Sequence, residues 1–269
     1  MEVFSVHAAD PEAELAADAL WAAGVAGVEE RSVGDGTTEL VAGFGPGVPD
    51  GAARIAAAVA GRWEVSVQPV DAAAWMDAWR PWARCTRVAG VVLHPPWVPL
   101  EASPDDVVVE LEPGHAWGHG GHPSTVLAAE LVVRAGLADR RVLDVGCGSG
   151  ALSLVAAVGG AAQVVAIDVD PEARRATAAN AARNGLAEHV SVLDVGLDAV
   201  GEVFDLVTAN LGVGVLAQLT DRLLDRVAPE GAGVVVSGLL EGQRTWSDDV
   251  VELDRAVADG WAAVRIRRV

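Results

Sequence analysis

The sequence predicts an α/β protein of two domains, in which a small ferredoxin-like α+β module precedes a parallel sheet with helices on both faces. Residues 1–70 follow the order strand, helix, strand, strand, helix, strand, whereas from residue 124 onward helices alternate with buried apolar runs. VLDVGCGSGALSL, residues 142–154, also reads as a strand, a glycine-rich turn and a helix start. We place the first domain at 1–70, a linker helix at 71–87 and the second domain at 88–269.

The first module is expected to contain four strands, near Val3–His7, Gly27–Ser32, Glu39–Phe44 and Trp63–Pro69. Its two helices are expected at Glu12–Ala23 and Ala52–Ala60, the first with Asp10 as N-cap and Pro11 as first helical residue. In DAAAWMDAWRPWAR, residues 71–84, Trp75 and Trp79 stand at helical spacing. A pair of this kind is more often packing between domains than a ligand platform.

The second domain is expected to open with two antiparallel strands, Val88–Leu93 and Val107–Leu111. The main sheet should then contain strands at Arg141–Asp144, Gln163–Asp168, Val190–Leu193, Phe204–Ala209 and Gly233–Ser237. Helices are expected at Thr125–Ala135, Ala151–Val158, Pro171–Asn184 and Val213–Val227. The tail VVELDRAVADGWAAVRIRRV predicts a closing antiparallel hairpin that turns at Asp259-Gly260. The helix usual before that hairpin is expected to be shortened.

The charge of the chain bears on its partners. The 269 residues carry 38 acidic and 19 basic side chains, all 19 of them arginine, for a net charge of −19. This argues against direct nucleic-acid binding through phosphates and favours a basic protein partner, although acidity that serves only solubility remains open. No targeting segment or membrane span is visible, so we expect a cytoplasmic location. Cys85 and Cys147 are too few for a disulfide framework.

The glycine-rich turn indicates a nucleotide-like cofactor. Gly146, Gly148 and Gly150 let the backbone turn tightly and approach a ligand without Cβ obstruction. The turn alone also fits a relaxed dinucleotide fingerprint. Asp144 favours the other reading, because a carboxylate at the strand end repels a pyrophosphate and attracts the ammonium and sulfonium charges of S-adenosylmethionine (SAM).

Three further strand ends carry candidate ligand groups. Asp168 is placed to accept hydrogen bonds from both ribose hydroxyls, and Asp194 either accepts from an adenine amino group or is a turn residue. Asn210 projects into the same crevice, where its amide oxygen and the next carbonyl, that of Leu211, accept from an amine. Asn210 also stands where it could cap the helix near Val213. Asp170 has a simple role as the cap of the helix beginning at Pro171.

The block PGHAWGHGGHPST…VLDVGCGSGALSL…AIDVDPEARRATAANAARNGL…FDLVTANL…VVVSGLLEGQ resembles the methyltransferases of ribosomal large-subunit protein eleven, the PrmA-like enzymes, in order and spacing. The likeness covers nearly the whole chain. It implies a Rossmann-like class I SAM-dependent methyltransferase domain acting on amino groups of a ribosomal protein that the ferredoxin-like domain recognises. Thr125, Gly146, Asp168 and Asn210 are the cofactor contacts that the resemblance implies.

The loop EPGHAWGHGGHPST, residues 112–125, places His115, His119 and His122 among glycines, a spacing open to a metal site. Of the three histidines only His122 matches the resembling family pattern, roughly P-G-x-A-F-G-T-G-x-H-P-T-T, so no metal is expected. The loop is instead expected to fold over bound SAM, with Thr125 capping the helix that follows. Trp117, His119 and Gly212 depart from the family pattern and leave the exact substrate open.

The expected reaction is an in-line transfer of a methyl group from SAM to a neutral amine. Asn210 and the Leu211 carbonyl are expected to orient the amine, and His122 or His119 is a weaker candidate to accept its proton. Three alternatives remain: a SAM enzyme for another protein lysine or a small amine, a nicotinamide-dependent oxidoreductase, and a SAM-binding module without catalysis.

Overall fold

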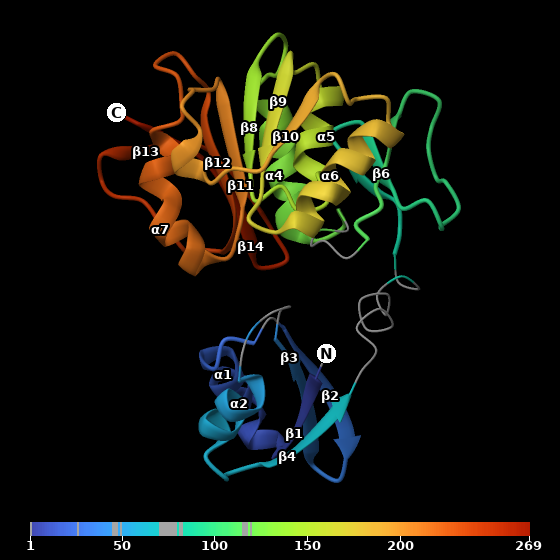
Figure 1. Cartoon of the computed structure of the whole chain (residues 1–269), viewed down its shortest axis with the longest axis vertical. Helices are drawn as coiled ribbons and strands as arrows, with labels where there is room; N and C mark the ends of the chain where they lie inside the picture. Colours follow the sequence, from blue (N-terminus) through green and yellow to red (C-terminus); the bar gives the residue numbers. More distant parts are fainter. Residues whose placement is uncertain are drawn as a thin grey trace. The chain divides into compact units, whose positions relative to one another are not determined.

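The structure, a computed structural model, describes residues 2–25, 27–44, 48, 50–69, 80, 83–114, 118 and 120–269. The chain divides into two compact units, Met1–Arg80 and Pro81–Val269, shown in Figure 1. Most of the predicted linker helix, with Trp75 and Trp79, lies outside the described residues. In the part that is described, no helix is both long and apolar enough to cross a lipid bilayer.

The first unit is a four-stranded antiparallel sheet with two helices. Its strands are β1 (Glu2–Ala9), β2 (Gly27–Gly34), β3 (Thr37–Gly43) and β4 (Glu64–Pro69), and its helices are α1 (Ala13–Ala22) and α2 (Gly51–Val59). The strand order β2-β3-β1-β4 is that of a ferredoxin-like module, as predicted. Apolar side chains from the sheet and from both helices, among them Phe4, Leu20, Leu40 and Ile55, form one buried core.

The predicted N-cap of the first helix is wrong. Asp10, Pro11 and Glu12 form a short 3-10 turn, and the α-helix begins only at Ala13. The Asp10 carboxylate accepts a hydrogen bond from the Thr38 hydroxyl at 2.8 Å, and the Asp10 N–H donates to the Gly36 carbonyl. Asp10 therefore ties the end of β1 to the β2–β3 turn, a long-range contact that the local capping pattern does not reveal.

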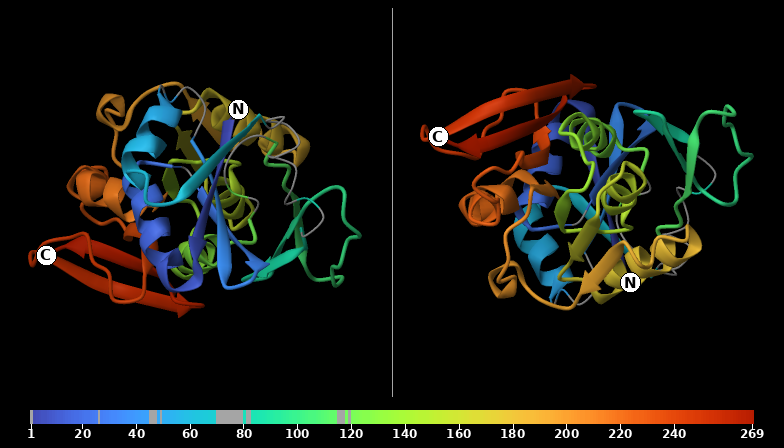
Figure 2. Two further views of the ribbon diagram at one scale, coloured as in Figure 1. Left: turned by 90° about the horizontal axis from the view of Figure 1, so that it is seen from below. Right: turned by 90° about the horizontal axis from the view of Figure 1, so that it is seen from above.

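The second unit contains the predicted parallel sheet. Its main strands are β8 (Arg141–Val145), β9 (Gln163–Ile167), β10 (Val190–Leu193), β11 (Leu206–Asn210), β12 (Gly233–Leu240), β13 (Val250–Ala258) and β14 (Trp261–Arg268). The strand order is β10-β9-β8-β11-β12-β14-β13, with β14 and β13 antiparallel to their neighbours. Figure 2 shows this closing hairpin in red at one margin of the sheet. Its turn has positive φ at Asp259 and Gly260, as the sequence predicts.

Two apolar cores, one on each face of this sheet, complete the unit. One core includes buried residues of α4 (Pro123–Arg134), α5 (Ala151–Val158) and α6 (Pro171–Arg183). The other includes α7 (Val213–Leu224) and a 3-10 turn, Leu197–Ala199. The predicted fold class, a Rossmann-like α/β domain after a small α+β domain, is confirmed. Residues 241–249, between β12 and β13, form no helix.

The lead-in strands differ from the prediction. β5 (Thr86–Val88) and β6 (Val91–His94) form a tight hairpin where a single strand was expected, and β7 (Val107–Glu110) pairs with β6 in parallel rather than antiparallel. Ala89 and Gly90 both have positive φ, 48° and 84°, which suits a two-residue hairpin turn. Alanine rarely occupies this region, so the sequence gives little sign of the turn.

Candidate functional site

Polar side chains gather where the parallel strands of the main sheet end. β8, β9, β10 and β11 run parallel, so their carboxyl ends meet at one edge of the sheet. Each strand ends in, or is followed by, an acid or an amide, and the four are Asp144, Asp168, Asp194 and Asn210. Ligands of open α/β sheets bind at this edge. All four residues therefore lie at or beside the carboxyl ends of these strands, and their contacts with a ligand stay a prediction.

The turn after β8 has no room for side chains at two of its glycines. Gly146 has φ +75°, and a Cβ added there would lie 2.4 Å from Cδ2 of Leu211. Gly150 has φ +89°, and its Cβ would lie 3.0 Å from the Thr177 side chain. The N–H groups of Gly146 and Cys147 both donate to the Ile167 carbonyl, which fixes the turn against the end of β9. These two glycines therefore permit close packing of the turn against Leu211 and Thr177.

Asp168 is held by two backbone N–H groups. One carboxylate oxygen accepts from Gly148 N at 3.0 Å and the other from Asp170 N at 2.9 Å. Asp170 also caps α6 by accepting from Glu172 N at 2.9 Å, as predicted. The half-buried Asp168 carboxylate is therefore oriented before any ligand arrives, and its remaining lone pairs suit a pair of hydroxyl donors.

Asp144 lies under the turn rather than open to solvent. It is 1% exposed, and its Oδ2 accepts from the Ser153 hydroxyl in the first turn of α5 at 2.5 Å. Burial raises the pKa of this carboxyl to about 6, with a smaller contribution from the nearby negative Asp168, while the Ser153 hydrogen bond opposes the rise. Asp144 can therefore act on a cationic ligand through its charge in a medium of low dielectric constant.

Asp194 extends from the end of β10 with 82% of its side chain exposed. Its Oδ1 lies 2.7 Å from Nη2 of Arg174, and Arg174 also donates to the Asp168 carbonyl at 2.8 Å. Arg174 therefore joins the loop after β9 to the loop after β10. An open hollow of about 260 Å³ is lined there by Arg174, Asp194, Pro171 and Val192, together with Arg175 and Ala178.

Asn210 contacts the start of α4. Its amide nitrogen donates to Thr125 Oγ1 at 3.0 Å, and Thr125 is buried in the first turn of that helix. This contact fixes the direction of the Asn210 amide, whose oxygen accepts no hydrogen bond within the described part of the chain. The N-cap of α7 is Gly212, so Asn210 does not cap that helix.

His122, not Thr125, is the N-cap of α4, which corrects the predicted capping role of Thr125. The His122 Nδ1 accepts from Ser124 N at 3.2 Å and lies 2.8 Å from the Ser124 hydroxyl. Its ring packs edge-on against Trp261, with centroids 4.7 Å apart. Because a protonated Nδ1 cannot accept, the capping geometry requires the neutral ring. Taking a proton at Nδ1 would break the cap, which weakens His122 as a general base.

Leu211 packs between the glycine turn after β8 and residues Ser237 and Gly238 of β12. Its N–H donates to the Ser237 carbonyl at 3.0 Å, and its side chain covers Gly146. On the other side, Gly238 has φ +90°, and a Cβ added there would lie 2.2 Å from the Leu211 carbonyl oxygen. Ser237 in turn donates to the Ser124 carbonyl at 2.8 Å. The peptide after Asn210 therefore has a fixed orientation at the edge of the site.

No cluster of three or more His, Cys, Asp or Glu able to hold a metal occurs in the described residues. His115, Trp117 and His119 of the predicted covering loop lie outside those residues, so the placement of that loop over a ligand stays a prediction. Gly118 is described, and its carbonyl accepts from the Ser149 hydroxyl of the glycine turn.

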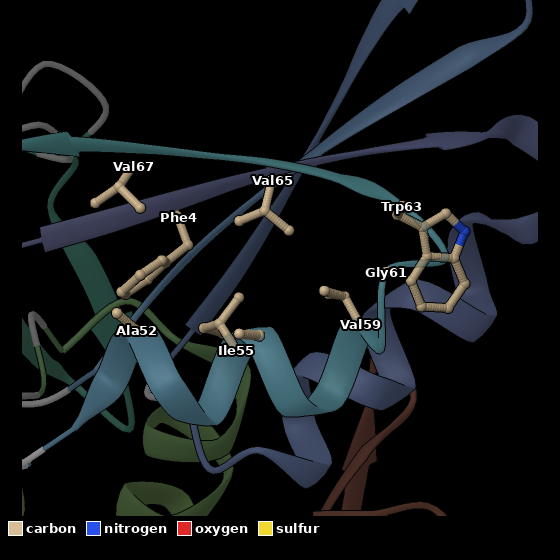
Figure 3. Close-up of a pocket in the computed structure, with 9 residues that line it drawn as sticks. Phe4, Ala52, Ile55, Val59, Gly61, Trp63, Val65 and Val67 are labelled. Atoms are coloured by element: carbon tan, nitrogen blue, oxygen red, sulfur yellow. The ribbon is translucent and has the colours of Figure 1, made fainter.

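A second hollow belongs to the first unit and has a different character. It has a volume of about 320 Å³ and lies between α2 and β4, as Figure 3 shows. Its lining is apolar and includes Phe4, Ile55, Trp63, Val65 and Val67. The residues that line this hollow provide no group for proton transfer or for binding a charged ligand.

Sequence reasoning missed the residues that hold the predicted ones in place. Ser153, Arg174 and Ser237 support Asp144, Asp194 and the start of α4, respectively. Of these three, only Ser153 could have been identified from the local sequence. It lies in the first turn of a helix that follows a glycine turn, where a hydroxyl points back toward the preceding strand. The contacts of Arg174 and Ser237 depend on how distant strands are ordered in the sheet.

Comparison with known proteins gives one consistent family. A family model described as Ribosomal protein L11 methyltransferase (PrmA) matches residues 50–266. A ribosomal protein L11 methyltransferase of Sorangium cellulosum (strain So ce56) is 36% identical over 264 residues, which cover 92% of this chain and 80% of the relative. One of Geobacter sp. (strain M21) is 36% identical over 173 residues, which cover 62% of this chain but only 56% of that relative's length.

A solved structure agrees with these relatives. The ribosomal protein L11 methylase of Lactobacillus delbrueckii subsp. bulgaricus is 29% identical, with a TM-score of 0.61. The match covers 67% of this chain and 95% of that one.

Proposed function

We propose that this chain, which belongs to the Ribosomal protein L11 methyltransferase (PrmA) family, transfers methyl groups from SAM to amino groups of a ribosomal large-subunit protein. The acceptors are a lysine side chain, the N-terminal amine, or both. The observation that carries the proposal is the Asp168 carboxylate held by the Gly148 N–H, beside a glycine-rich turn at the strand ends.

The residues at this edge fit SAM. Asp168 would bind the ribose hydroxyls, Asp194 the adenine amino group, and Gly146, Gly148 and Gly150 would allow the methionine part to approach the backbone. Asp144 would favour its positive charges, and Thr125 would reach the cofactor from α4. A dinucleotide fits less well, because its pyrophosphate would lie beside the negative charges of Asp144 and Asp168. Bound SAM supplies a methyl group made electrophilic by the sulfonium.

The chain's own task in the reaction is to hold the acceptor. The oxygen of the Asn210 amide and the carbonyl of Leu211 would accept hydrogen bonds from the amine and so direct its lone pair at the methyl group. A lysine amine has an ordinary pKa of about 10.4 and an N-terminal amine about 8. Partial desolvation and a neighbouring positive charge lower both values. Because His122 Nδ1 is engaged with Ser124, we infer that the amine enters in the neutral form.

Incubation with methyl-labelled SAM and ribosomal subunits tests this function. We expect label on one large-subunit protein, on lysine or on the N-terminal amine as located by mass spectrometry. Label only on another protein or on a small amine would support the alternative acceptor instead. Calorimetric binding of NAD without binding of SAM would support the oxidoreductase, and SAM binding without any labelled acceptor would support the non-catalytic module.

The first unit is the proposed contact for the basic partner. Acidic residues outnumber arginines over residues 1–80, and the apolar hollow beside β4 adds a surface suited to burial against a protein. This charge complementarity favours a ribosomal protein as the occupant, since such proteins must neutralise RNA phosphates. The recognition role of the first unit therefore rests on charge and on one apolar surface.

Replacing Val67 by arginine is expected to weaken methylation of the ribosomal protein, with a rise in KM of about tenfold, because a charge would enter the hollow and repel a basic partner. SAM affinity should stay within about twofold of that of the unaltered chain. Val33→Arg is the matched control, since Val33 is 53% exposed on β2 and Val67 is 48% exposed on β4. Equal KM values for the two variants would show that the hollow does not take part in binding the partner.

A further inference from the structure

One face of α6 carries three polar side chains that reach backbone groups outside the helix. Thr177, Asn180 and Asn184 are spaced by three and then four residues, so they lie along one face. The Thr177 hydroxyl donates to the Gly148 carbonyl at 2.9 Å. Asn184, the C-cap of α6, reaches Glu110 at the end of β7, and Asn180 reaches Glu112, two residues beyond that end. The face therefore spans two segments that are far apart in sequence.

The two asparagines take the place of a neighbouring strand for the end of β7. The N–H of Leu111 donates to His94 in β6, so the polar groups of Glu110 and Glu112 point the opposite way. Asn184 accepts from Glu110 N at 2.8 Å and donates to Glu110 O at 2.7 Å. Asn180 forms the same pair with Glu112, at 3.1 and 2.9 Å.

The spacing of these side chains follows from the geometry of helix and strand. Four residues of an α-helix rise about 6 Å, and two residues of a strand rise about 6.6 Å. Amides at positions i and i+4 of a helix therefore meet successive outward-facing peptide groups of an edge strand. Each amide offers one acceptor and one donor side, as a backbone peptide does.

Asn180 differs from Asn184 in one contact. Its amide nitrogen donates not only to Glu112 O but also, at 2.9 Å, to the Ser149 carbonyl in the glycine turn. The corresponding second bond of Asn184 goes to the Asn180 carbonyl, within α6 itself. Asn180 is 1% exposed and Ser149 is equally buried, so water does not readily replace this bond.

We propose that Asn180 is a positioning residue for the cofactor turn, which it holds in the binding conformation by tying Ser149 to the end of β7. Asn184 makes the same strand-like pair, but its side-chain hydrogen bonds within the described residues go only to Glu110 and Asn180, so it ties α6 to β7 without holding the turn. The assignment rests on the proposed function in one respect, namely that the turn binds SAM.

The test compares Asn180→Ala with Asn184→Ala in the full chain. Hydrogen exchange without ligand should be faster over residues 107–113 in both variants, and faster over residues 145–151 only in Asn180→Ala. Calorimetry should show SAM affinity about tenfold weaker for Asn180→Ala and within about twofold for Asn184→Ala. Melting temperatures of both variants separate general destabilisation from this local effect.

Equal exchange over residues 145–151 in the two variants, or equal SAM affinities, would overturn the proposal. If Asn180→Ala does not fold, Asn180→Ser retains one hydroxyl donor and should show a smaller change in the same direction. Absence of SAM binding by the unaltered chain would contradict the proposed function instead, and the exchange comparison would still test the link between Asn180 and the turn.

Discussion

Replacing Gly238 by alanine is expected to lower kcat for methyl transfer by about 100-fold while SAM affinity changes by no more than about threefold. The new Cβ would lie 2.2 Å from the Leu211 carbonyl oxygen and 2.9 Å from its carbon, and both are backbone atoms that cannot rotate away. The Leu211 peptide, held on its other side by Ser237, would have to move. Because that carbonyl is proposed to aim the acceptor amine, a shift of about 1 Å would misdirect the lone pair. Steady-state kinetics with calorimetry measure the two effects separately.

Two other glycines provide controls for this variant. Gly233, at the opposite end of β12, also has positive φ, and its Cβ would meet the Ile266 carbonyl at 2.3 Å. Gly242 has φ +84° with no atom within 4 Å of the added Cβ, so alanine there adds backbone strain alone. We expect Gly233→Ala to lose more stability, because of its clash, and Gly242→Ala to lose only about 1 kcal/mol from backbone strain, with kcat per folded molecule unchanged in both. If Gly238→Ala keeps kcat within about threefold, the Leu211 carbonyl does not orient the acceptor.

The positions of the strand ends could be predicted from sequence because they depend on local patterns. Short strand-like runs, VL before Asp144, VVAI before Asp168 and VSVL before Asp194, place these three aspartates at strand ends without knowledge of the strand order. The parallel arrangement then requires those ends to lie on the same edge of the sheet. The candidate site and the fold could therefore be predicted from the same local sequence patterns.

The contacts between segments could not be predicted in this way. The burial of Asp144 under Ser153 and the capping of α4 by His122 depend on side-chain directions in three dimensions. Histidine is not among the preferred N-cap residues, so the nearby threonine was the natural choice from sequence. The Asn180 pair with Glu112 joins residues 68 positions apart, and the pattern AANAARNG contains no sign of its partner.

Replacing Asp144 by asparagine is expected to stabilise the free chain at pH 8 and to weaken SAM binding at the same pH. The folded pKa of about 6 lies above the value of 3.8 for an unperturbed aspartate, so the folded chain binds this proton more tightly than the unfolded chain does. The contribution of this carboxyl to the stability of the chain is therefore greatest below about pH 4 and is lost as the pH rises through about 6. A difference of about two pKa units corresponds to about 3 kcal/mol lost at pH 8, which a neutral amide avoids while still accepting from Ser153.

The negative charge of Asp144 is also the group proposed to attract the positive charges of SAM. SAM affinity of the unaltered chain should fall as the pH drops through about 6, because protonation removes the attraction of Asp144 for the sulfonium and the ammonium. Asp144→Asn should bind SAM about tenfold more weakly at pH 8 and show little of this dependence. Ser153→Ala removes a hydrogen bond that lowers the pKa, so its binding transition should move to higher pH. Thermal melts from pH 5 to pH 8 measure the stability of each variant, and calorimetry over the same range measures its affinity for SAM. A variant that is more stable but binds SAM as tightly as the unaltered chain would mean that the buried carboxylate serves the fold of the turn and not the charge of the ligand.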